Sequence, residues 1–199
     1  MHDELQAFLE NPTPRNYRTV RDAILGAPDF RAGGLGLAEV AELCDRGCFE
    51  QAQAKIADLM PDWALSPRIH CYAAWAAQEL GDQQEFELER FLLSTCMQGL
   101  LGSGDGSKSR PYLVSQTADV YDVLQAFARR ASRQMLVESG AGRLFDVVLC
   151  DDSSEIWFDV TGLQRADRLA SSAIGLQSHV QHHIPFDALT NPAISIRAD

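Results

Sequence analysis

The amino-acid sequence predicts an α+β protein in which antiparallel helical hairpins pack with a small antiparallel sheet and one further helix. Gly47 and Gly81 lie 34 residues apart (81 − 47 = 34), each between two segments whose apolar residues recur at helical spacing. A regular step of this kind is typical of repeated helical hairpins. After residue 102 the apolar positions alternate, as they do in half-buried strands. We therefore divide the chain into helical hairpins (1–101), a small α+β module (102–165) and a partly ordered C-terminal extension (166–199).

The helical region begins with two short helices and continues with two hairpins. We expect a helix over 3–10 and another from Pro14, a favourable first helical residue, to about Leu25. The helix after Gly47 carries the pattern Gly-x-Phe-x-x-Ala-x-x-x-Ile and is predicted to end before Pro61. An aromatic and a small residue at these places let two helices cross closely, as in tetratricopeptide repeats. The hairpin around Gly81 departs from this pattern, and at least three repeats are normally needed for independent stability. We therefore predict a short tetratricopeptide-like layer packed against another module.

The α+β module follows a Gly- and Ser-rich break at residues 102–111. Its predicted elements, in order, are a strand over 112–115, a helix over 117–129 and strands over 133–138, 143–150 and 155–161. The order strand, helix, strand, strand, strand predicts a small antiparallel sheet with the helix packed on one face. Residues 175–199 carry little periodic signal and are predicted to form a partly ordered tail.

Charge and cysteine content restrict the possible functions. The formal net charge is −11, which disfavours binding to nucleic acids and anionic lipids. No apolar run approaches the ~20 residues that span a bilayer, and the N-terminus lacks a basic leader. The five cysteines are odd in number and form no C-x-x-C pair, so we expect free thiols and no zinc site. These observations predict a cytoplasmic protein without nucleic-acid or membrane partners.

Two motifs are close to known chemical signatures but lack an essential residue. The loop over residues 102–109 is close to a phosphate-binding loop, but Ser107 stands where that motif requires glycine. We therefore interpret it as a structural turn. His179, His182 and His183 lie in the predicted tail and lack a Glu-containing metal motif, and no Gly-x-Ser-x-Gly elbow occurs. The sequence predicts no cofactor and no metal site.

Short phrases distributed over residues 12–165 carry a family resemblance. They are Asn16-Tyr17-Arg18-Thr19-Val20-Arg21, Gly104-Asp105-Gly106, Pro111-Tyr112, Val114, the stretch around Tyr121 and Leu124, and Trp157-Phe158-Asp159-Val160. Together they resemble an uncharacterised bacterial family of unknown function. In that family short helical hairpins precede a small module that ends in a Tyr/Trp-Phe-Asp-Val/Ile phrase. The resemblance implies the same order of modules here and no particular activity.

Two functional hypotheses follow from the sequence. The favoured one is a non-enzymatic protein-interaction or adaptor module, with Trp63, Tyr72 and Trp75 as candidates for an exposed partner surface. The alternative is an enzyme or small-ligand binder with an acidic site where helices and sheet meet. Its candidate residues are Asp105, Tyr112, Asp146, Trp157 and Asp159. General acid/base chemistry would require these carboxylates to line one cleft. The sequence predicts neither the partner nor the oligomeric state.

Overall fold

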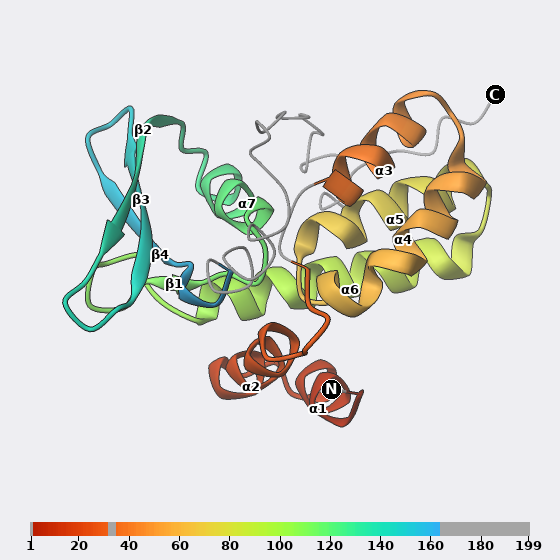
Figure 1. The fold of residues 1–199 in the computed structure, drawn as a ribbon. Coiled ribbons are helices and arrows are strands. Elements are labelled where there is room, and N and C mark those ends of the chain that lie inside the picture. Colours follow the sequence, from red (N-terminus) through yellow and green to blue (C-terminus); the bar gives the residue numbers. More distant parts are fainter. Residues whose placement is uncertain (1, 32–34, 164–199) are drawn as a thin grey trace.

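The computed structural model describes residues 2–31 and 35–163 and shows an α+β fold (Figure 1). A layer of helices lies on one side of the molecule, a twisted sheet lies on the other, and helix α7 lies between them (Figure 1). The helices are α1 (His2–Glu10), α2 (Pro14–Leu25), α3 (Leu35–Asp45), α4 (Phe49–Trp63), α5 (Pro67–Glu79), α6 (Gln83–Gly102) and α7 (Ala118–Ala126). The strands are β1 (Tyr112–Leu113), β2 (Ala131–Glu138), β3 (Leu144–Cys150) and β4 (Glu155–Asp159). The predicted tail over 175–199 lies outside the described residues.

The two predicted hairpins are present and turn with the same backbone geometry. Gly47 and Gly81 have φ angles of +71° and +75°, a left-handed conformation that favours glycine. After each, the next amide bonds back to the last turn of the preceding helix, from Cys48 N to Leu43 O at 2.8 Å and from Asp82 N to Ala77 O at 2.9 Å. This pattern is the Schellman motif that closes a helix at glycine.

The N-terminal helices follow their predicted capping signals. Pro14 begins α2, and the Thr13 side chain accepts a hydrogen bond from the amide of Asn16. Helix α6 carries Gly99 where α1 and α2 pack against it. A Cβ atom at residue 99 would lie 2.5 Å from the Tyr17 ring and 2.6 Å from the Phe8 ring. The absence of a side chain there lets both rings approach the α6 backbone.

Helix α4 continues beyond the predicted stop at Pro61 and ends at Trp63. The proline lies in the last turn of the helix, and the Trp63 ring that follows is 2% exposed. The apolar contacts of Trp63 in the core hold this last turn in helical conformation, so the local proline signal did not determine the boundary.

The sheet is mixed, which corrects the predicted all-antiparallel arrangement. Its strand order is β1-β4-β3-β2, with β2, β3 and β4 antiparallel and β1 parallel to β4. The strand β1 is also shorter than predicted, because the amides of Ser115 and Gln116 bond the Asp119 carboxylate at 2.7 Å and 2.9 Å instead of a neighbouring strand. The chain then passes through α7 to the far edge of the sheet (Figure 1).

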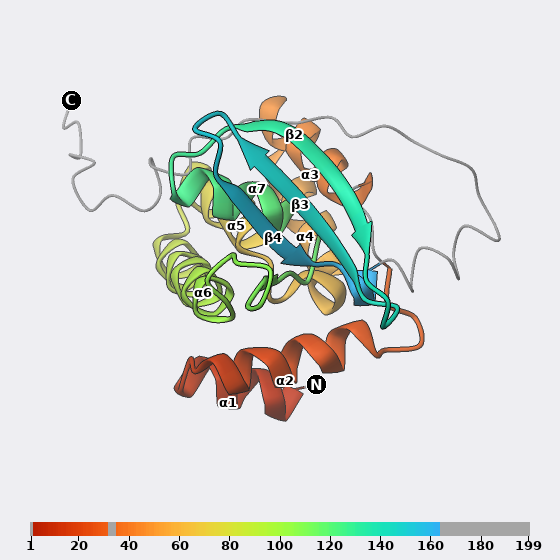
Figure 2. The ribbon, with the colours of Figure 1, turned by 90° about the vertical axis from the view of Figure 1, so that its left-hand side faces the viewer.

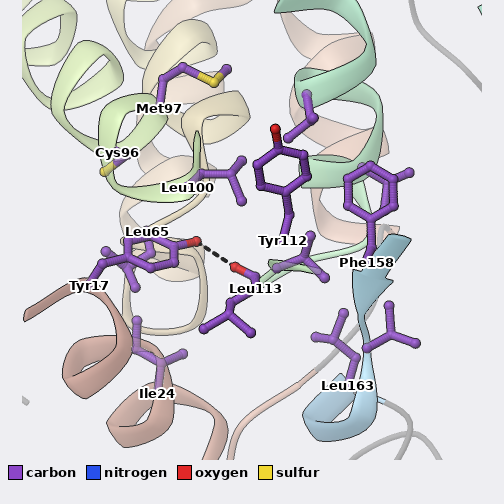
Figure 3. Packing of buried hydrophobic residues seen from close by; sticks show 14 of the residues in the cluster. Tyr17, Ile24, Leu65, Cys96, Met97, Leu100, Tyr112, Leu113, Phe158 and Leu163 are labelled. Carbon is purple, nitrogen blue, oxygen red and sulfur yellow. Dashed lines mark hydrogen bonds between the residues drawn. The ribbon is translucent and has the colours of Figure 1, made fainter. Parts of the chain in front are cut away.

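The hydrophobic core consists of two clusters. One joins α3, α4 and α5 around residues such as Val40, Ile56 and Ile69. The other crosses residue 102, since it contains Phe8, Tyr17 and Leu93 from the helices together with Phe158 and Val148 from the sheet. Figure 3 shows Tyr17, Leu100, Tyr112 and Phe158 packed together in this second cluster. The first two helices and the sheet therefore share a core across the sequence boundary.

Candidate functional site

An arginine-rich cleft lies where α2, the loop over 103–111 and the ends of β1, β3 and β4 meet. It has a volume of about 480 Å³. Its lining residues, which we call the arginine cleft, are Arg18, Arg21, Asp22, Ser103, Ser109, Arg110, Pro111, Leu113, Arg143 and Asp159. Figure 2 shows α2 passing beneath the ends of the sheet strands, which places the helix at one wall (Figure 2).

Helix α2 is attached to the sheet by two side chains one helical turn apart. The Tyr17 hydroxyl donates to the carbonyl of Leu113 at 2.9 Å, as drawn in Figure 3. Arg21 donates from Nε to the carbonyl of Val114 at 2.8 Å and from Nη2 to the carbonyl of Asp159 at 3.1 Å. Residues four apart share one face of a helix, so both side chains reach the sheet. These two hydrogen bonds join the ends of β1 and β4 through Arg21, which is 6% exposed.

Arg143 and Asp159, which also line the cleft, form an ion pair. Arg143 Nη2 donates to Asp159 Oδ2 at 2.8 Å, and the guanidinium stacks 4.9 Å from the centre of the Phe145 ring. Burial acts to raise the pKa of Asp159, but hydrogen bonds from Arg143 and Thr161 and the charge of Arg21 hold it below its ordinary value. Asp159 is therefore ionised at neutral pH, and its carboxylate orients the Arg143 guanidinium while its backbone carbonyl accepts from Arg21.

The Gly-rich loop contributes the residues at its two ends, Ser103 and Ser109 to Pro111, to the lining of the cleft, and it is closed by its own hydrogen bonds. The amide of Asp105 bonds the carbonyl of Arg110 at 2.9 Å, and the amide of Ser107 bonds the Asp105 carboxylate at 2.9 Å. A Cβ atom on Gly104 would lie 2.4 Å from the carbonyl oxygen of Pro111, so the tight turn requires glycine. With these amides engaged, the loop is the structural turn that the sequence predicts, and it presents Arg110 at the mouth of the cleft.

Two of the four arginines are weakly held. The Arg18 side chain is exposed and makes no hydrogen bond or ion pair within residues 2–31 and 35–163. Arg110 lies 3.4 Å from the Asp105 carboxylate, with both side chains about half exposed or more (67% and 49%). An exposed pair of this kind contributes little stability. The cleft thus combines the buried guanidinium of Arg21, the half-exposed guanidinium of Arg143 that Asp159 holds, and the two adjustable guanidinium groups of Arg18 and Arg110.

The structure does not gather the predicted acidic residues in one place. Asp159 lines the cleft, whereas Asp105 lies at its edge against Arg110. Asp146 pairs in register with Phe158 and therefore points to the other face of the sheet from Asp159, where Gln134 donates to its carboxylate. Tyr112 is buried against Phe158, and Trp157 is half-buried under Lys108. The predicted convergence of carboxylates is not observed.

The predicted aromatic partner surface is also corrected. Trp63 and Tyr72 are each 2% exposed and belong to the cluster of α3, α4 and α5. Trp75 is partly buried and packs edge-on against the Phe49 ring, with 6.0 Å between ring centres. These aromatic side chains fill the space between hairpins, which is where a short helical layer needs its largest apolar groups.

A second group of charges, which we call the buried polar seam, lies between α5 and its neighbours α6 and α7. It consists of Ser66, Arg68, His70, Glu89, Asp119 and Asp122, all 7% exposed or less. Arg68 pairs with Asp122, and Ser66 donates to Asp119 at 2.6 Å. Nδ1 of His70 lies 2.6 Å from Glu89 and Nε2 lies 3.1 Å from the carbonyl of Ala64.

Protonation in the seam follows from burial and pairing. Burial raises the pKa of Asp122 to about 7, although Arg68 acts in the opposite direction. Burial acts to lower the pKa of His70, but Cys96 and the Glu89 carboxylate raise it to about 10. Both partners of the His70 ring are acceptors, which agrees with a ring that donates from both nitrogens. The seam is enclosed, so we interpret it as structural.

The arginines of the cleft were not among the predicted site residues. One signal was present in the sequence, because Arg21 recurs at helical spacing with Tyr17 and Ile24 on an otherwise apolar face. A charged residue in such a stripe requires a defined buried partner. No local pattern connects Arg18 with Arg110 or Arg143, which come from separate elements.

Comparisons with protein-family models, curated protein sequences and solved structures found no match for this chain. The family resemblance therefore stays a prediction. Within the described part of the chain, no helix combines the length and apolar character needed to cross a membrane. The same residues contain no group of three or more His, Cys, Asp or Glu side chains arranged to hold a metal ion, and the tail histidines lie outside them.

Proposed function

We propose that this protein is a non-enzymatic interaction module that holds an anionic group of a partner protein in the arginine cleft. The observation that carries the proposal is the charge of the cleft. Four arginines face two aspartates among its lining residues, a balance of +2 (4 − 2), in a chain whose formal net charge is −11. Positive charge concentrated in one concave part of an acidic protein attracts anions and orients them.

The polarity of the cleft supports a protein partner over an apolar small molecule. Small-molecule sites are lined predominantly by apolar side chains. Here the apolar lining residues are Pro111 and Leu113, and charged or hydroxyl groups supply the rest. Charged groups in an open cleft favour the rate and specificity of protein association. The cleft therefore suits one anionic side chain or chain terminus on the surface of another protein.

The chemistry of the lining favours binding over catalysis. General acid/base catalysis works best with a group whose pKa lies near the working pH. The lining contains neither histidine nor cysteine, and the pKa of Asp159 is held low by its arginine and backbone partners. The alternative of an acidic enzyme site has less support, because only one of its three proposed carboxylates lines the cleft.

Affinity purification with charge-reversed variants tests the proposal. The tagged protein is expected to recover a stoichiometric partner from its native lysate, and Arg18→Glu/Arg110→Glu is expected to lose it. Both arginines are exposed, so the variant should fold normally. Raising the ionic strength should weaken the wild-type complex, because salt screens exposed charges.

The matched control is Arg15→Glu/Arg133→Glu, which changes the net charge by the same amount. Arg15 is exposed on α2 three residues from Arg18, Arg133 is exposed on β2, and neither lines the cleft. The control should retain the partner. Equal retention by both double variants, or the absence of any stoichiometric partner, would show that the cleft has no role in association.

A further inference from the structure

The charge of the cleft indicates which class of anion it binds. This inference rests on the proposed function. We infer that the arginine cleft recognises a phosphate monoester, presented as a phosphorylated side chain of the partner protein. The inference combines three features of the cleft: its charge balance, the hydrogen-bond donors that remain unused, and the readiness of Arg110 to change partners.

The charge balance matches a dianion. The two carboxylates already in the cleft neutralise two of the four guanidinium groups, because Asp22 lies 3.3 Å from Arg21 and Asp159 lies 2.8 Å from Arg143. The remaining charge of the lining is +2 (4 − 2), and Asp105, which lies outside the lining, offsets part of it through its exposed contact with Arg110 at 3.4 Å. A phosphate monoester carries about −1.5 to −2 charges at pH 7, whereas a single carboxylate carries about −1. A phosphate that displaces Asp105 from Arg110 therefore matches the charge of the lining more closely than a single carboxylate does.

The fixed arginines retain unused donors at the cleft. A guanidinium has five N–H groups. Arg21 uses one on Nε, one on Nη1 and one on Nη2 for Val114, Asp22 and Asp159, which leaves two (5 − 3) among the described contacts. Arg143 uses one for Asp159 and leaves four (5 − 1). Because the Arg21 guanidinium is buried and held by three hydrogen bonds, it loses little conformational entropy when an anion binds, and Arg143 is partly oriented by its hydrogen bond to Asp159.

The adjustable arginines can close on the ligand from the mouth. Arg18 is exposed, and Arg110 is held only by the exposed Asp105 carboxylate at 3.4 Å. A phosphate offers three acceptor oxygens and can form paired hydrogen bonds with a guanidinium, whereas Asp105 makes one exposed contact with Arg110 at 3.4 Å. It can therefore replace Asp105 as the partner of Arg110. The net charge of −11 disfavours a polyphosphate strand, which would approach more of the acidic surface than one isolated phosphate does.

Direct titration with short blocked peptides tests the inference. The probes are Ala-phosphoserine-Ala, the matched Ala-glutamate-Ala, and inorganic phosphate, followed by calorimetry and by the NMR signal of the Arg21 Nε–H group. We expect the phosphoserine peptide to bind about tenfold more tightly than the glutamate peptide at pH 7.5. Its advantage should fall below pH 6, as the second phosphate proton returns at a pKa of about 6.

Variants connect this preference to the cleft. Arg18→Gln/Arg110→Gln should abolish the preference for phosphoserine, and Arg15→Gln/Arg133→Gln should keep it. Asp105→Asn should strengthen phosphoserine binding about two- to fivefold, the equivalent of one exposed ion pair. Asparagine keeps a side-chain oxygen for the Ser107 amide, which the Asp105 carboxylate accepts at 2.9 Å, so the loop should stay closed.

The outcomes separate the two proposals. Equal binding of the phosphoserine and glutamate peptides would overturn the phosphate inference and leave the proposed anion-binding function standing. Equal affinity for inorganic phosphate and the phosphoserine peptide would overturn a phosphorylated protein segment in favour of a free phosphate. If no probe binds while cleft variants still lose the partner, the phosphate inference fails alone. If no probe binds and the variants keep the partner, both fail.

Discussion

The buried polar seam and the arginine cleft both pair arginine with aspartate, but they differ in solvent access and in charge balance. In the seam Arg68 and Asp122 face each other with side chains 9% and 0% exposed, and His70 faces Glu89 in the same enclosed layer. In the cleft Arg110 and Asp105 are about half exposed or more, at 67% and 49%, and arginines outnumber aspartates among the lining residues. The same residue types therefore serve two different purposes.

The fold pairs its buried charges and leaves its excess positive charge at the surface. A buried charge must be paired, so the seam links α5 to α6 and α7 by buried ion pairs and hydrogen bonds, although Asp122 Oδ2 has no hydrogen-bond partner among the described residues. In the open cleft, the exposed ion pairs contribute little to the free energy of unfolding. The exposed arginines can therefore exchange an aspartate for another anion. Arg21 belongs to both situations, because it is buried and bonded to backbone carbonyls yet lines the cleft.

The largest expected effect comes from breaking the pair in the seam. Arg68→Met leaves the fully buried Asp122 carboxyl without its partner, and loss of one member of a buried pair costs about 3–5 kcal/mol. The free energy of unfolding, measured by urea denaturation, should fall by this amount. The double variant Arg68→Met/Asp122→Leu should recover most of it, because an apolar replacement removes both charges. A single-variant loss below about 1 kcal/mol would contradict the structural role of the seam.

A smaller effect is expected where Arg21 joins α2 to the sheet. Arg21→Met removes donors from the carbonyls of Val114 and Asp159, and leaving buried acceptors unpaired should cost about 2–4 kcal/mol in total. Arg18→Met, on the same helix and exposed, should change the free energy of unfolding by about 0.5 kcal/mol or less. Similar losses in the two variants would remove the distinction between fixed and adjustable arginines.

The remaining expected effect is a pH dependence of stability that comes from His70. The pKa of His70 is about 10 in the folded protein and about 6.5 in the unfolded chain, so the folded state binds more protons between these values. Stability from the His70–Glu89 pair should be complete below pH 6.5 and should decrease as pH rises towards 10 and His70 loses its proton. Urea titrations over this range should show the decrease in the wild-type protein and a flatter profile in His70→Gln. Identical profiles would exclude a charged His70.

Much of the helical architecture was predictable because its signals are local. Gly47 and Gly81 mark turns where the backbone adopts positive φ, a conformation that glycine accepts without strain. Pro14 and Thr13 similarly mark the start of α2. The strands β2, β3 and β4 were recognisable from alternation, although their ends shifted by one or two residues. Signals of this kind depend on neighbours in sequence and not on the final packing.

The candidate site was largely unpredictable from the same information. The sequence identified Asp159 but grouped it with Asp146, which the pleat of β3 directs to the opposite face. It treated Trp63 and Tyr72 as surface candidates, whereas the packing of α3, α4 and α5 buries both. Strand register determines which face of the sheet a side chain occupies, and helix packing determines which aromatic side chains are buried. Local sequence patterns predict neither.

The sequence alone determined the order of the elements, the two glycine-closed hairpins and the acidic character of the chain, because each follows from residue type and short-range spacing. The tertiary structure decided that β1 pairs in parallel with β4, that the helices and sheet share a core, and that Arg18, Arg21, Arg110 and Arg143 meet around one cleft. Those arginines come from α2, the Gly-rich loop and the residue before β3, so only long-range packing could bring their charges together.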